Sequence, residues 1–124
     1  MATNVQPEQE HMVDVNARTV QIQMVVQAIV RRFRPTRVIL FGSYAYGSPD
    51  EDSDVDLMVI TNTETSPLHV AASIAAAIPH PLPIDIIVKT PADLESALQQ
   101  GNVFETEVVE RGIVVYEAEN SGMD

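Results

Sequence analysis

The chain has 124 residues, with 18 acidic and 7 basic side chains and a formal net charge of −11. This length fits one domain, and the lack of cysteine excludes a disulfide framework and a thiolate zinc site. No apolar run reaches the roughly 18 residues of a membrane span, and the first residues contain no signal peptide. We therefore expect a cytoplasmic protein. Its charge would repel nucleic acid and membranes and favour basic partners or divalent cations, although acidity can also serve solubility alone.

Residues 1–17 are polar without a sustained period and predict a flexible tail. A helix is expected from Arg18 to the residues before Pro35, which stops it. Its apolar residues recur at gaps of three and four and so share one face: Ile22, Val25, Val26, Ile29, Val30 and Phe33. The continuous apolar run 38–41 predicts a strand that is buried on both faces, and residues 44–52 predict a short helical turn followed by a loop.

Further along, strands and helices alternate. Residues 54–61 contain many apolar and some β-branched side chains and predict a second strand. Ser66, followed by proline, should cap the helix that comes next. A third strand is expected at residues 84–88, and a short last strand at residues 113–116.

Two helices are expected between the third and the last strand. Thr90 should cap the first of them, and Asn102 with Glu105 should form a capping box at the second. This order of elements predicts an α/β (α+β) fold, with a small mixed sheet of three to four strands packed with helices. We assign this domain to residues 18–117 and a C-terminal tail to residues 118–124.

Two carboxylates, Asp54 and Asp56, stand two positions apart in the predicted second strand. Strand side chains alternate between faces, so both would point to one side, about 6.6 Å apart along the strand. Asp85 lies inside the apolar run of the third strand, where an isolated acid is disfavoured. Like charges side by side are costly without a cation, and carboxylate oxygens suit Mg²⁺. We therefore predict that these three carboxylates converge on one or two metal ions.

A simpler interpretation of the same acids remains open. The pair could belong to the acidic loop of residues 50–52 that precedes it, and Asp85 could be exposed at a sheet edge. What favours a site is the order of the motifs. Gly42 and Ser43 directly follow the first buried strand, where glycine allows close backbone approach to an anion and the serine hydroxyl adds a donor. Ten residues separate Ser43 from Asp54, so one short loop would join a phosphate turn to a metal site.

The segment 41–60, FGSYAYGSPDEDSDVDLMVI, resembles the signature of the minimal nucleotidyltransferases (MNT) in the DNA polymerase β-like superfamily. The likeness extends from about Arg18 to Tyr116 and is carried by Gly-Ser, ten residues, Asp-x-Asp and a later acid. It implies a polymerase β-like fold and, with Mg²⁺ as cofactor, transfer of a nucleoside monophosphate to a hydroxyl: AMP from ATP, or the equivalent group from another nucleoside triphosphate. By this resemblance Asp54, Asp56 and Asp85 would be catalytic and metal-binding, and Gly42 and Ser43 would bind the nucleotide.

Many minimal members are similar to antitoxins that adenylylate a tyrosine of a helical HEPN-type ribonuclease. The resemblance thus implies a toxin partner and no direct contact with nucleic acid or membrane. This chain lacks the second helical domain of larger relatives, so a partner or a second copy would shape the acceptor site. It also has Tyr44 and Tyr46 where relatives often carry arginine.

Two alternative functions stay open at this stage. The chain could be a catalytically weak antitoxin that neutralises a basic partner by contact, which its charge and the two tyrosines favour. It could also modify a small molecule, such as an antibiotic hydroxyl, although no feature of the sequence describes an acceptor pocket.

Overall fold

The computed structural model describes residues 15–47, 49–50, 53–78 and 83–119. The predicted tails lie mostly outside these ranges, although α1 already begins at Val15. The elements of the described chain follow the predicted order: α1 (Val15–Phe33), β1 (Arg37–Phe41), α2 (Ser43–Tyr46), β2 (Val55–Ile60), α3 (Pro67–Ala77), β3 (Ile84–Lys89), α4 (Pro91–Gln99), α5 (Val103–Arg111) and β4 (Ile113–Glu117).

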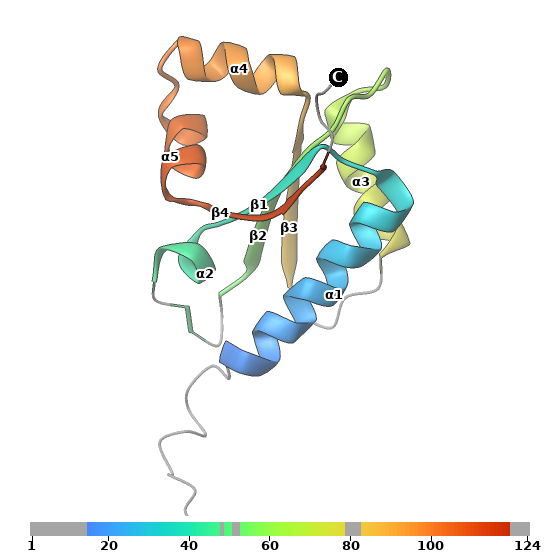
Figure 1. The fold of residues 1–124 in the computed structure, drawn as a ribbon, viewed down its shortest axis with the longest axis vertical. Helices are drawn as coiled ribbons and strands as arrows, with labels where there is room; N and C mark the ends of the chain where they lie inside the picture. The colour runs from blue at the N-terminus through green and yellow to red at the C-terminus, as the bar shows by residue number, and fades with distance from the viewer. Residues whose placement is uncertain (1–14, 48, 51–52, 79–82, 120–124) are drawn as a thin grey trace, which may run out of the picture.

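The strands form one four-stranded mixed sheet in the order β3-β2-β1-β4. β1 is antiparallel to both β2 and β4, whereas β2 and β3 are parallel and are connected through α3. Figure 1 shows α1 and α3 on one side of the sheet and α4 and α5 on the other. The predicted α/β class, with a small mixed sheet packed with helices, is confirmed.

The sheet separates two apolar clusters, one on each face. The first cluster packs β1 and β2 against α1 and α3 and contains Val55, Leu57 and Val59. The second packs the other face against α4 and α5 and contains Met58 and Ile60. Because both faces are covered, β2 is apolar at successive positions rather than at alternate ones.

Local sequence signals account for the start of α3, the start of α4 and the end of α1. Ser66 Oγ accepts a hydrogen bond from the His69 N–H at 3.0 Å, and Thr90 Oγ1 accepts one from the Asp93 N–H at 3.1 Å, so both predicted caps are confirmed. α1 ends at Phe33, where the next residue adopts a φ of 51° before the proline that cannot continue the helix. None of the described helices is both long and apolar enough to cross a membrane.

The predicted capping box at α5 is wrong. Asn102 occupies the N-cap position, but its side chain makes no capping hydrogen bond. Glu105 instead forms an ion pair with the Lys89 ammonium of β3 at 2.9 Å and is only 8% exposed. The hydrogen bond from Lys89 lowers the pKa of Glu105. A charged donor is a stronger partner for a buried carboxylate than a neutral backbone N–H.

The two-sided burial of β2 predicts that this strand tolerates little loss of volume. Leu57 is fully buried, so Leu57→Ala should lower the free energy of unfolding by about 2–5 kcal/mol. The matched control is Leu68→Ala on α3, where the leucine is 81% exposed and the change should stay within about 0.5 kcal/mol. Urea denaturation of both variants measures the difference, and equal losses would contradict this assignment of the core.

Candidate active site

Acidic residues from neighbouring strands meet at one end of the sheet. Asp56, the second residue of β2, is in register with Asp85 of the parallel strand β3 and with Phe41, the last residue of β1. Adjacent strands lie about 4.8 Å apart, so the two aspartates are direct neighbours. Both share the face of the second cluster, because Asp56 alternates with Leu57 and lies two positions from Met58.

Asp54 lies just outside the strand in which it was predicted. β2 begins at Val55, and Asp54 is an exposed residue immediately before it. Its charge still acts on the same site. The pKa of Asp56 is raised above its ordinary value by burial first, then by the charges of Asp85 and Asp54. Asp56 and Asp85 are therefore neighbours, with Asp54 two residues before Asp56, and their joint role at a metal stays a prediction.

The donor chemistry of this cluster suits a hard divalent cation, but the side chains would have to turn toward it. Carboxylate oxygens are the ligands that Mg²⁺ prefers. Among the described residues, however, no group of three acidic or histidine side chains could hold one ion together as they stand. Asp85 is exposed and belongs to an edge strand, as the simpler interpretation of the sequence expected. The strand register brings the donors to one place, and their orientation toward a metal stays a prediction.

Gly42 forms the turn between β1 and α2 and touches the acidic cluster. Its φ of 79° and ψ of −159° belong to a region that L side chains rarely adopt. A Cβ at this position would also overlap Asp56 Oδ2. Glycine is thus required twice, once for the backbone conformation and once for the close approach of the carboxylate.

α2 starts directly at this turn. The Gly42 carbonyl accepts hydrogen bonds from the Ala45 N–H at 2.9 Å and the Tyr46 N–H at 2.8 Å. No side chain caps the helix at Gly42. The first N–H groups of a helix have no acceptor within the helix, and Ser43 is the first residue here. The turn therefore lies beside Asp56, and the phosphate binding expected there stays a prediction.

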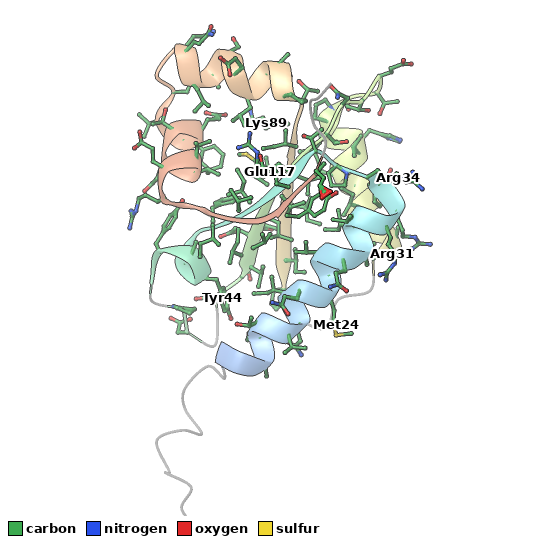
Figure 2. All side chains as sticks on the ribbon, viewed as in Figure 1. Met24, Arg31, Arg34, Tyr44, Lys89 and Glu117 are labelled. Carbon is green, nitrogen blue, oxygen red and sulfur yellow. The ribbon has the colours of Figure 1, made fainter. Side chains whose placement is uncertain are left out.

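The two tyrosines of α2 have different surroundings. Tyr44, labelled in Figure 2, packs against the first cluster, and its buried hydroxyl lacks a hydrogen-bond partner among the described residues. Tyr46 packs against the second cluster, and the Arg111 guanidinium carbon lies 4.3 Å from its ring centroid. The sequence analysis did not predict this contact, because Arg111 is far from the motif in the chain. Its only local signal is a basic residue in the last turn of a helix, which usually reflects the helix dipole.

Comparisons with known proteins identify the family and the fold of the chain. The sequence profile of the nucleotidyltransferase domain family matches residues 22–115. The fold resembles the crystal structure of a proposed nucleotidyltransferase from Sulfolobus solfataricus, with a TM-score of 0.63 and 16% sequence identity over 99% of this chain and 98% of that chain. At that identity the likeness establishes the fold alone. No curated protein sequence matches the chain.

The contact between Gly42 and Asp56 can be tested by adding a methyl group. Gly42→Ala and Gly47→Ala each force a side chain onto a positive φ, which costs about 1–3 kcal/mol. Nothing lies near a Cβ at Gly47, whereas a Cβ at Gly42 would displace the Asp56 carboxylate. Gly42→Ala should therefore lower the free energy of unfolding more than Gly47→Ala does. In an Asp56→Ala background this excess should disappear, and its persistence would show that the backbone alone accounts for it.

Burial of Asp56, together with the like charges around it, predicts a pH-dependent stability in the presence of a chelator. A carboxyl whose pKa is raised in the folded state binds more protons when folded, so it destabilises the fold at pH values above its pKa. Asp56→Asn should thus stabilise the protein at pH 7. The gain should shrink as pH falls toward the ordinary aspartate pKa of about 3.9. Urea denaturation from pH 7 to 4 tests this, and a gain that grows on acidification would refute it.

Proposed function

Because the chain belongs to the nucleotidyltransferase domain family, we propose that it transfers AMP from ATP to a hydroxyl group of a protein acceptor. Family membership supports nucleotidyl transfer in general. The observation that carries the proposal is the meeting of Asp56, Asp85 and the Gly42 turn at one end of the sheet, with Asp54 beside them.

The reaction joins the acceptor oxygen to the α-phosphorus and breaks the bond from that phosphorus to the oxygen that bridges it to the β-phosphate. Pyrophosphate leaves, and Asp85 would take the acceptor proton. Asp54, Asp56 and Asp85 would hold Mg²⁺, which when bound neutralises phosphate charge and lowers the pKa of the attacking hydroxyl. Ser43 and the turn at Gly42 would hold the phosphates of the leaving group. Catalysis then consists mainly of positioning and charge neutralisation.

The proposed acceptor is a tyrosine on a basic helical partner, a HEPN-type ribonuclease that the modification silences. The net charge of −11 supports a basic partner, because it steers association with positively charged proteins. The residues on which this proposal rests would form the nucleotide half of the site, and we assign the acceptor half to another molecule. On the partner, a neutral phenol would become a phosphodiester with one negative charge, which repels RNA and blocks access to its surface.

Two observations favour a second candidate, an antitoxin that acts by contact alone. The carboxylates of the described chain do not converge on one ion as they stand. The phosphate turn also continues into Tyr44 and Tyr46, neither of which brings a positive charge to a triphosphate. In this case the acidic surface would bind the ribonuclease without any transfer.

One experiment separates the two candidates. The purified chain, Mg²⁺ and ATP labelled at the α-phosphate are mixed with the protein encoded by the neighbouring gene. We expect label on a tyrosine of that protein, located by mass spectrometry, and loss of its ribonuclease activity. Because the double variant Asp54→Asn, Asp56→Asn removes two carboxylates from the proposed metal site, it should abolish labelling and inhibition together.

Two controls test whether the double variant is folded and whether loss of surface charge alone would abolish labelling. Circular dichroism should show that the double variant is folded. Asp93→Asn, Glu95→Gln on the exposed surface of α4 removes the same charge away from the site and should label normally. If the double variant inhibits the partner as well as the unaltered chain does, and no label appears with either, contact is the mechanism and transfer is excluded.

A further inference from the structure

We infer that Arg111 is the residue that contacts the phosphate tail of the nucleoside triphosphate, and that Tyr46 positions it there. The inference rests on the proposed function and adds a residue to it. An acidic site needs a cation of its own near the phosphates, because carboxylates and phosphates repel each other wherever no positive charge lies between them.

Most basic residues of the chain lie at the wrong end of the sheet. β1 runs from Arg37 to Phe41, and Phe41 pairs with Asp56, so Arg37 marks the end opposite the site. Lys89 lies at that opposite end as well, four positions after Asp85 on β3, and is bound to Glu105. Arg31 and Arg32 lie in the last turn of α1, and Arg34 follows it before β1. Figure 2 shows Arg31 and Arg34 well away from Tyr44.

The two remaining basic residues, Arg18 and Arg111, belong to helices on opposite faces of the sheet. Arg18 is near the start of α1, which packs on the first cluster. Asp56 faces the second cluster, on which α5 packs through Val108. Of the seven basic residues of the chain, all of which the structure describes, Arg111 alone therefore lies both near the acidic end of the sheet and on the acidic face.

The backbone next to Arg111 is closely packed against β1. Ile113 pairs with Leu40 at the end of β1 that leads into the Gly42 turn. A Cβ at Gly112 would overlap the Val108 carbonyl and the Ile39 side chain and lie 3.0 Å from the Leu40 carbonyl oxygen. The last turn of α5 is thus held in contact with the strand that leads into the phosphate turn.

The Arg111 side chain is held by two contacts and still has N–H donors available. Its guanidinium carbon lies 4.3 Å from the Tyr46 ring centroid, and one nitrogen is 3.1 Å from Glu107 Oε2. The side chain remains 55% exposed. A guanidinium has five N–H donors in a planar fork that matches phosphate oxygens, so further donors are available. Tyr46 carries no charge, but its ring holds the Arg111 guanidinium of α5 beside α2, the helix that begins at Ser43.

The test measures binding rather than turnover. ATP with a methylene group between its α- and β-phosphates cannot transfer AMP, so it and AMP can be titrated calorimetrically with Mg²⁺. Losing charged hydrogen bonds to phosphate should make Arg111→Met bind the triphosphate about tenfold more weakly. Its affinity for AMP should change less than twofold. The matched control, Arg31→Met at the far end of α1, removes the same charge and should bind both ligands normally.

Two further variants test the position of the side chain. Glu107→Gln releases Arg111 from its ion pair and should tighten triphosphate binding up to about threefold. Tyr46→Leu should weaken binding about threefold, but only while Arg111 is present. Equal weakening by Tyr46→Leu in the Arg111→Met background would assign Tyr46 a structural role and overturn its part of the inference.

Failure of this inference differs from failure of the proposed function. If the unaltered chain binds the triphosphate and Arg111→Met binds it equally well, the inference is wrong and the proposed function stands. If the unaltered chain binds no triphosphate, both are overturned. Should thermal unfolding show that Arg111→Met is misfolded, Arg111→Lys keeps the charge and the stem, and normal affinity in that variant would exclude a role for the planar fork.

Discussion

The register of β2 between its two neighbours decides where every polar group of the site lies. It sets Asp56 opposite the end of β1 and beside Asp85 of β3. A slip by one residue would turn Asp56 into the first cluster, where an unpaired carboxylate would be buried at a high cost. The apolar residues that follow would be buried on either face, so the charge at the start of β2 is what disfavours the slipped register.

This arrangement has an electrostatic cost that the fold tolerates because it is confined to the strand ends. The residues of β2 that follow Asp56 are fully or almost fully buried. At its start, burial and two like charges raise the pKa of Asp56. Conflict of this kind between a local group and the rest of the fold is typical of functional sites. At the opposite end of β3, by contrast, the charges of Lys89 and Glu105 are matched.

Local sequence signals predicted most of the framework. Apolar runs located the strands, and Ser66 and Thr90 marked helix starts because an N-cap depends on neighbouring residues only. The start of β2 was displaced by one residue at Asp54, since the acidic pair itself suggested an extended strand. The capping box at Glu105 failed because a distant lysine offered a stronger partner. The contact between Arg111 and Tyr46 could not be predicted, since it joins residues far apart in the chain and depends on how α5 returns to β1.

The contact between Gly42 and Asp56 also bears on how this chain can change over generations. Because Gly42 has no side chain, the Asp56 carboxylate occupies the space where a Cβ would lie. A substitution at position 42 is therefore easier to tolerate if the acid at position 56 is also replaced. A lineage that lost the acid would be released from this steric restriction, although the backbone conformation would still favour glycine.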